Sequence, residues 1–250
     1  MPELPEAERA RQILEQHAVG RTVARVDDTD AFVCRPHPAG EIDGVMHGLV
    51  ITGARRRGKA LWLETDGGID LALHLGMSGS FRANGAPSPR NWDRFTIWFT
   101  DGTHLALHDK RRLGRARLDA DRTRLGPDAA DVTRADFRRR VGRGRIAVKA
   151  RLLDQSTLAG VGNLIADEAL WRARIGPSVP AASLDEARLD RLRVELRAVI
   201  RDALKPGGGS GRGAFARSRR SGTCVRCGAP LERGTIGGRT TYWCTAEQAG

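Results

Sequence analysis

Three of the four cysteines in this 250-residue chain lie close together near its C-terminus. Cys224 and Cys227 are separated by two residues, Cys244 follows after sixteen more, and Glu247 stands three residues beyond it. Thiolates at this spacing suit one tetrahedral zinc ion, and so small a module has too little core to fold without a structural metal. The pattern predicts a zinc-ribbon-like finger. Glu247 occupies the position usual for a fourth cysteine, so either its carboxylate completes the site, or zinc is weakly held or absent.

A second pattern that suits ligand binding is Gly160-Val161-Gly162-Asn163, followed by an apolar helical stretch. Two glycines and an asparagine at a helix start would present backbone N–H groups and a side-chain amide at the positive end of the helix dipole. Such an end is a ready site for a phosphate. The alternative is an ordinary capped helix-turn-helix without a ligand.

The charge of the chain points to a polyanionic partner. Its formal net charge is +12 and its pI about 10.9, with basic residues spread along the whole length. Binding to phosphates would then depend steeply on salt. A ribosomal or membrane-surface protein is the alternative. Because the sequence has no apolar run of about 18 residues and its first residues lack the apolar core of a signal peptide, we expect a cytoplasmic protein, nucleoid-associated if bacterial.

The elements that must position these residues change in type along the chain. Short runs rich in β-branched and aromatic residues, separated by Gly and Asp turns, predict an antiparallel β-sandwich over residues 1–120. They are 21–26, 49–54, 60–64, 69–75, 94–99 and 104–107. A linker is expected at 121–135, and the lone Cys34 of the first region is expected to be a buried, inert side chain.

Helical periodicity follows over residues 136–206. The expected helices are 136–141, 147–154, 163–172 and 183–204, with Thr133 and Ser183 as N-caps. Residues 207–250 hold a glycine-rich loop and then the cysteine module. The fold class is therefore α+β: an N-terminal antiparallel sandwich, a helical domain and a small metal module.

Read together, six motifs resemble those of the formamidopyrimidine-DNA glycosylase and endonuclease VIII family over essentially the full chain. They are Pro2-Glu3-Leu4-Pro5-Glu6, the lone Lys59, His74 to Gly79, Asp109 to Gly114, the Gly160 to Asn163 turn and the cysteine module. The resemblance implies a β-sandwich joined to a helix-two-turn-helix DNA-binding domain with a zinc finger, and a monomer that binds damaged duplex DNA. It also implies a base-excision-repair glycosylase with apurinic/apyrimidinic lyase activity.

The resemblance gives the nucleophilic role to Pro2, once Met1 has been removed. A prolyl N-terminus is a secondary amine, and an unperturbed α-amino pKa of roughly 7.7 to 8.0 leaves a useful neutral fraction near pH 7. Attack on the sugar C1′ would expel the base and leave a Schiff base. Glu3 would transfer the protons that open the sugar ring, with Glu6 in support. Without the resemblance, Glu3 and Glu6 read as first-turn helix acids.

Further roles come from the same resemblance. Lys59 and His74 would hold the DNA backbone near the lesion. Met77, Arg111 and Leu113 would fill the void left by the flipped-out nucleotide, and the arginine would read the orphaned base. Asn163 and Arg239 would clamp the flanking phosphates, and Cys224, Cys227, Cys244 and Glu247 would hold the zinc.

Three departures from the family pattern place the preferred lesion in question. Leu113 stands where the formamidopyrimidine branch usually has phenylalanine, the segment between Pro206 and Cys224 is shorter, and Glu247 replaces a cysteine. Two alternatives from other classes stay open. One is a catalytically quiet lesion-binding protein of the same fold, and the other is a basic zinc-ribbon protein that binds RNA, for which aromatics at 5% give little stacking surface.

Overall fold

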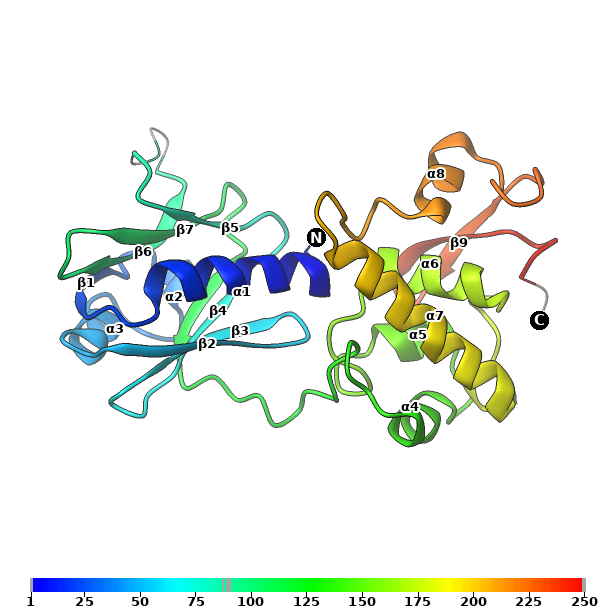
Figure 1. Ribbon diagram of the computed structural model, residues 1–250, viewed down its shortest axis with the longest axis horizontal. Coiled ribbons are helices and arrows are strands. Elements are labelled where there is room, and N and C mark those ends of the chain that lie inside the picture. The colour runs from blue at the N-terminus through cyan, green and yellow to red at the C-terminus, as the bar shows by residue number, and fades with distance from the viewer. Residues whose placement is uncertain (1, 87, 89–90, 249–250) are drawn as a thin grey trace. The chain divides into compact units, whose positions relative to one another are not determined.

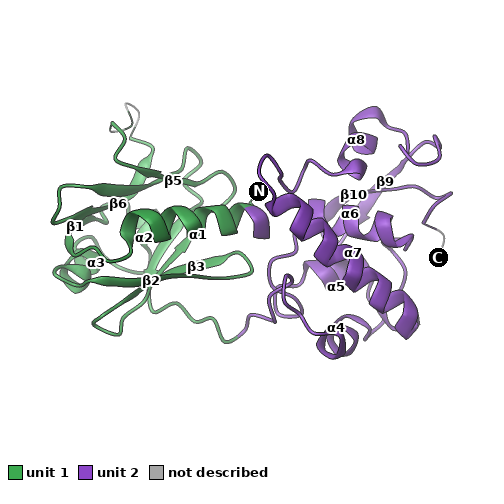
Figure 2. Ribbon diagram, viewed as in Figure 1, with its two compact units in different colours: residues 1–2, 6–123 green, residues 3–5, 124–250 purple. Residues whose placement is uncertain are grey.

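The computed structural model describes residues 2–86, 88 and 91–248, so Met1 lies outside the described residues. The chain forms two compact units, which are coloured in Figure 2. Unit 1 consists of residues 1–2 and 6–123, and unit 2 of residues 3–5 and 124–250. The catalytic dipeptide expected at the N-terminus is thus divided, with Pro2 in unit 1 and Glu3 in unit 2. Each unit is described by itself.

Unit 1 is a sandwich of two four-stranded antiparallel sheets (Figure 1). The first sheet has the strand order β1 (Val23–Asp27), β6 (Asp93–Phe99), β7 (His104–His108) and β5 (Ser80–Ala83). The second has the order β2 (Ile51–Arg57), β3 (Ala60–Thr65), β4 (Leu71–His74) and β8 (Arg115–Leu118). Both sheets contribute side chains to one apolar core. The predicted antiparallel sandwich is confirmed.

The alternation of buried and more exposed side chains along a strand determines which face of the sheet packs on the core. In β3, Leu61, Leu63 and Thr65 are buried while the residues between them are half-buried. A period of two places every second side chain on the same face of a strand. Two strands, β5 and β8, were not predicted, because each has four residues of which only one, Phe81 or Ala116, is buried.

The described helices of unit 1 are α2 (Ala31–Cys34), α3 (Glu41–Met46) and, from Glu6 onward, α1 (Leu4–Ala18). Asp30 caps α2 by accepting the N–H groups of Phe32 and Val33. Cys34, at the end of α2, is fully buried, and burial raises the pKa of its thiol to about 12. This thiol is therefore protonated and inert at neutral pH, as predicted.

Unit 2 is built around a buried helix, α6 (Asn163–Ala173). It is packed against α5 (Val148–Leu153), α7 (Glu186–Leu204), α8 (Ala214–Ser221) and β10 (Arg239–Trp243), while α4 (Arg134–Val141) contacts α5 and α7. Every residue of α6 from Ile165 to Trp171 is buried. No helix in the ranges that the structure describes is long and apolar enough to cross a membrane.

Of the two N-caps predicted for unit 2, the structure confirms one and contradicts the other. Thr133 caps α4, since its Oγ1 accepts the N–H of Asp136 at 3.1 Å. The prediction that Ser183 caps the long helix is wrong: Ser183 belongs to a 3-10 turn (Ala181–Ser183), and Asp185 caps α7 by accepting the N–H of Arg188 at 2.7 Å. The shorter helix lets Leu184 turn into the core before α7 begins.

Two further features of unit 2 were not expected from composition. Ala129 and Val132, within the segment predicted as a linker, are buried in the core of this unit. The helix α8 lies between the glycine-rich loop and the cysteines. The cysteine module itself contains a hairpin of β9 (Glu232–Ile236) and β10.

A buried ion pair joins α5 to α6 and reaches the hairpin. The Nζ of Lys149 lies 2.6 Å from the Oδ1 of Asp167, and the two side chains are 0% and 1% exposed. Lys149 also donates to the Oγ1 of Thr241 in β10 at 2.6 Å. Burial lowers the pKa of Lys149 and raises that of Asp167, and the attraction between the two charges opposes both shifts.

Replacing Lys149 by alanine should lower the free energy of unfolding by about 3–5 kcal/mol, because it leaves the buried Asp167 carboxylate with only Arg219, whose Nη1 lies 3.9 Å away, as counter-charge. The double variant Lys149→Met, Asp167→Leu should lose less free energy of unfolding, since neither charge of the pair remains. Urea unfolding followed by circular dichroism measures both, with the exposed Lys205→Ala as control. Equal losses in the single and double variants would contradict this view of the pair.

Candidate functional site

Glu3 is held at the N-terminus of α6 by both of its carboxylate oxygens. Its Oε1 accepts the backbone N–H of Leu164 at 2.8 Å, and its Oε2 accepts that of Ile165 at 3.0 Å. The residue is 1% exposed. The first N–H groups of a helix have no partner within the helix, and they carry the positive end of its dipole. The helix start that was predicted as a phosphate site therefore binds a carboxylate of the protein itself.

Gly162 makes room for this carboxylate. A Cβ at position 162 would lie 2.2 Å from the Cδ of Glu3. In addition, the backbone N–H of Leu4 donates to the carbonyl of Gly160 at 3.2 Å, which fixes the chain next to Glu3. The glycines of the turn thus serve the close approach of the N-terminal segment.

The other predicted catalytic residues lie in unit 1. Pro2 is half-buried, as are Glu6 and Lys59, and Glu6 Oε1 lies 4.0 Å from Arg9 Nη1. Lys59 lies near enough to His74 for its charge to act on the imidazole. Lys59 and His74, each expected to contact the DNA backbone, are therefore neighbours.

His74 is fixed in one tautomer by its surroundings. Its Nδ1 accepts the N–H of Gly76 at 2.9 Å. Although His74 is exposed at the surface, desolvation of its ring by nearby protein atoms and the positive charge of Lys59 both lower its pKa. The imidazole is therefore neutral at pH 7 with its proton on Nε2, an N–H that can donate to an acceptor such as a phosphate oxygen.

A single buried carboxylate organises the two loops that carry Met77, Arg111 and Leu113. Asp109 is fully buried, and its Oδ1 accepts from the Ser78 hydroxyl and the Arg111 N–H, both at 3.0 Å. Its Oδ2 accepts the N–H groups of Leu113 and Gly114, both at 2.7 Å. Four hydrogen bonds from two loops to one carboxylate fix the loops relative to each other.

The loops also touch directly. Gly76, with φ of +59°, approaches the backbone of Leu113 so closely that a Cβ would lie 2.5 Å from its carbonyl carbon. Met77, which is 42% exposed, and the exposed Arg111 are displayed next to the half-buried Leu113. Met77 and Arg111 are therefore both accessible to solvent at these loops.

Asn163 and Arg239 are also brought together. The Nδ2 of Asn163 donates to the carbonyl of Thr240 at 3.0 Å, directly beside Arg239 in β10. Lys149 holds the same strand through Thr241, whose hydroxyl in turn donates to the carbonyl of Arg239 at 3.0 Å. The helix start and the hairpin thus form one polar surface of unit 2, with the exposed Arg239 at its edge.

The three C-terminal cysteines converge. The Sγ atoms of Cys224, Cys227 and Cys244 all lie within 4.8 Å of one another, and no other such cluster of metal-binding side chains occurs in the ranges that the structure describes. The residues present fit a metal ion. Trp171 of α6 supports the cluster, since its Nε1–H points to Cys224 Sγ at 3.4 Å and its ring stacks on Phe215 with centroids 5.6 Å apart.

Glu247, predicted as the fourth ligand, does not belong to this cluster. Its Oε2 lies 3.0 Å from the Nη1 of Arg226 and 3.5 Å from the Nε of Arg174. The carboxylate is engaged with two guanidinium groups instead of meeting the thiols. The structure therefore supports three of the four predicted metal ligands and not the fourth.

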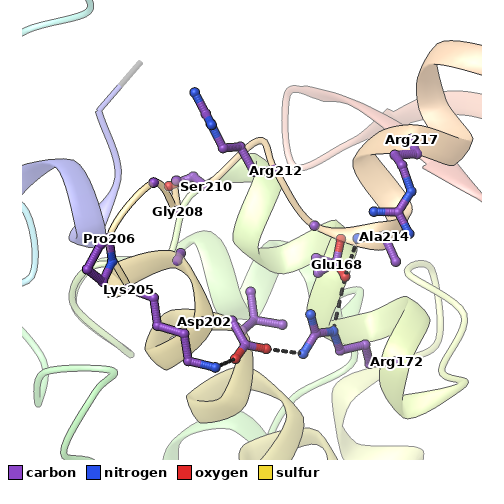
Figure 3. Close-up of a pocket in the computed structure, with 15 residues that line it drawn as sticks. Glu168, Arg172, Asp202, Lys205, Pro206, Gly208, Ser210, Arg212, Ala214 and Arg217 are labelled. Atoms are coloured by element: carbon purple, nitrogen blue, oxygen red, sulfur yellow. Dashed lines mark hydrogen bonds and ion pairs between the residues drawn. The ribbon is translucent and has the colours of Figure 1, made fainter.

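A cavity of about 590 Å³ lies between α7, the glycine-rich loop and the start of α8 (Figure 3). Glu168 closes one side: its two oxygens accept the N–H groups of Ala214 at 3.2 Å and Phe215 at 2.9 Å, and its Oε1 also pairs with Arg172 at 3.0 Å. Arg172 continues to Asp202, which pairs with Lys205 (Figure 3). This chain of charges ties both ends of the loop to α6.

Comparison with known proteins identifies the family. The models of the formamidopyrimidine-DNA glycosylase N-terminal domain and of its H2TH domain match residues 1–116 and 125–213. A formamidopyrimidine-DNA glycosylase of Acidothermus cellulolyticus is 38% identical over 99% of this chain and 97% of its own length. The chain belongs to the formamidopyrimidine-DNA glycosylase family.

Solved structures of the family share the fold along the whole chain. The Lactococcus lactis protein in complex with DNA containing an abasic site has a TM-score of 0.85 at 27% identity, covering 99% of this chain and 100% of that one. A structure of MutM with DNA containing carbocyclic 8-oxo-G has a TM-score of 0.87 at 29% identity and covers both chains fully. The helical domain predicted at 136–206 is thus the H2TH domain of this family.

Three residues that organise the site had not been assigned a role from the sequence. Asp109 opens a motif that was singled out, yet only its neighbours were expected to act. Asp167 and Glu168 lie on the buried side of α6, where two adjacent acids in an otherwise apolar helix were the available signal of buried partners. In this member of the formamidopyrimidine-DNA glycosylase family, these acids hold the loop and hairpin of unit 2.

Removing the Glu168 carboxylate should loosen the start of α8. In Glu168→Ala, the amides of Ala214 and Phe215 lose their acceptor, and their hydrogen exchange should accelerate roughly tenfold or more, since a lost charged acceptor costs about 1.5–3 kcal/mol. Glu195→Ala, a matched change on α7, should leave both amides unaffected. Unchanged exchange in Glu168→Ala would show that α8 does not depend on this contact.

Proposed function

We propose that this chain excises oxidised or otherwise damaged bases from duplex DNA and then cleaves the abasic strand, with Pro2 as nucleophile. The observation that carries the proposal is the placement of Glu3 next to Pro2. Its carboxylate is fixed by two N–H groups at the start of α6, in a space that Gly162 leaves open. A buried acid held this rigidly beside a chain terminus suits proton transfer at one defined position.

In the proposed reaction the neutral amine of Pro2 attacks C1′ of the damaged nucleotide, and the base departs with the electron pair of its bond to C1′ and takes up a proton. The Pro2 nitrogen then loses its own proton, which restores its lone pair. A proton delivered to the ring oxygen O4′ by Glu3 opens the sugar, and the nitrogen lone pair forms the C=N bond of an iminium ion. This cation withdraws electrons from C2′, so loss of a C2′ proton expels the 3′-phosphate by β-elimination. Water then hydrolyses the iminium and regenerates the amine.

The remaining residues would hold and open the DNA. Lys59 and the neutral His74, with its Nε2–H free of the Gly76 contact, suit the phosphates near the lesion. Met77, Arg111 and Leu113, on loops fixed by Asp109, suit insertion into the stack when the nucleotide is flipped out. Asn163 and Arg239 would bind phosphates from the polar surface of unit 2.

The metal of the three-cysteine cluster is proposed to be zinc. Thiolate ligands from a hairpin module are typical of structural zinc sites, and such an ion stabilises the fold without taking part in the reaction. Cys224, Cys227 and Cys244 would hold it, with Trp171 donating to Cys224 from outside the ligand set. The hairpin with Arg239 would then keep its place on α6.

Borohydride should trap a covalent adduct between the protein and duplex DNA carrying an abasic site, once intact mass shows that Met1 is absent. Insertion of one glutamine between Met1 and Pro2, which adds no side-chain amine, should sharply reduce trapping, because the Pro2 nitrogen is then an amide. The variant should still bind the duplex. A wild-type protein that binds lesion DNA without trapping or cleavage would instead favour the catalytically quiet lesion-binding protein.

Replacing Gly162 by alanine should lower the rate of base excision by about 100-fold or more, because the new Cβ would displace the proton-transferring Glu3. Gly211→Ala is the matched control, since its Cβ would meet only Leu164 Cδ1 at 3.5 Å. Single-turnover cleavage of a panel of duplexes, each with one lesion, measures both rates. A wild-type rate in Gly162→Ala would remove Glu3 from the mechanism.

A further inference from the structure

Glu247 stands three residues after Cys244, where the family pattern has a fourth cysteine. Its carboxylate takes part in an ion-pair network. Glu247 Oε2 contacts Arg226 at 3.0 Å and Arg174 at 3.5 Å. The Glu247 side chain is 13% exposed, so its charge is largely withdrawn from solvent. These three residues are called the C-terminal clasp below.

Arg226 is held on α6 by its side chain, and Arg174 directly follows that helix. Arg226 Nη1 donates to the carbonyl of Trp171 at 3.2 Å, and its guanidinium lies 3.9 Å from the centre of the Trp171 ring. Arg174 follows α6 in a left-handed conformation, and its backbone N–H closes the helix end on the carbonyls of Leu170 and Trp171. The clasp therefore joins the C-terminal turn to the end of α6.

Gln248 adds a second link of the same kind. It is 4% exposed, its Nε2 donates to the carbonyl of Ile175 at 2.9 Å, and its Oε1 accepts the N–H of Cys244 at 3.0 Å. The turn after Cys244 is thus held by side chains of the protein on both sides of position 247. A bond from Glu247 to a metal is not needed to keep this turn in place.

We propose that Glu247 does not bind the metal: the C-terminal clasp takes over the structural role of a fourth ligand, and the three thiolates hold zinc with water in the fourth position. This inference rests on the proposed zinc site. Moving Glu247 to the ion would leave Arg226 and Arg174 without their shared carboxylate.

The open position has a consequence for exchange of the metal. Cys227 is exposed, so solvent reaches the cluster from that side. A metal site with four protein ligands exchanges its ion only after a bond between the metal and a protein ligand breaks. In a site with three protein ligands and a water, a chelator can first displace the water. Zinc in this chain should therefore be more weakly held than zinc in a four-cysteine version of the same module.

The test measures zinc retained by the purified full-length protein against increasing concentrations of a competing chelator. Glu247→Gln and Glu247→Ala should change the Kd for Zn²⁺ by less than about threefold, while Glu247→Cys should tighten it by about 100-fold or more. In the Co²⁺-substituted protein, the thiolate charge-transfer band should stay unchanged in Glu247→Gln and grow in Glu247→Cys. A Kd raised more than about 30-fold in both Glu247→Gln and Glu247→Ala would overturn the inference.

The clasp itself is tested by stability. Glu247→Gln and Arg226→Gln should each shift the urea midpoint of the zinc-loaded protein downward, and the double variant should lose less than the sum of the two. If the shifts of the urea midpoint in the two single variants were additive in the double variant, or if neither single variant shifted it, the inference would also be overturned. A wild-type protein that retains no zinc at any chelator concentration would instead remove the proposed zinc site, so the two failures are distinguishable.

Discussion

The structure of unit 2 depends on one constraint, the satisfaction of charged and polar groups on the buried helix α6. A charge withdrawn from water is tolerated only when it is paired and hydrogen-bonded, and leaving one partner alone is costly. Each polar group of α6 therefore fixes a different segment: the first N–H groups hold Glu3, Asp167 holds Lys149, Glu168 holds the start of α8 and Trp171 supports Cys224. The helix acts as a common frame for the N-terminal acid, the loop, the hairpin and the metal module.

This arrangement links the Glu3 carboxylate to the metal module, although Glu3 and Cys224 lie 221 positions apart in the sequence. Both are fixed on the same eleven-residue helix, one at its first turn and the other near its last. Because α6 is packed on several sides, a shift at one end would disturb buried contacts at the other. The three-cysteine cluster and the Glu3 carboxylate thus depend on the same helix.

In unit 1, the equivalent organising group is the Asp109 carboxylate. It holds two loops that are more than thirty residues apart in sequence, as its contact with Ser78 shows. The spacing of motifs could nominate Met77, Arg111 and Leu113, because each lies in a recognisable run. Motif spacing could not show that Asp109 aligns these residues, because a hydrogen bond between loops distant in the sequence produces no periodic sequence pattern. The short strands β5 and β8 and the helix α8 were missed for a related reason: they are defined by their partners and not by their own pattern.

The sequence by itself determined the α+β class, the sandwich, the helical domain, the cap at Thr133, the family and the three clustered thiols. These follow from local periodicity, capping chemistry and motif spacing, which depend on neighbours along the chain. Only the tertiary structure decided that the glycine turn receives Glu3, that Asp185 caps α7 in place of Ser183, and that Glu247 faces two arginines. In each case several groups of similar chemistry could have made the contact. The partner that does so is the one that packing brings within hydrogen-bonding distance.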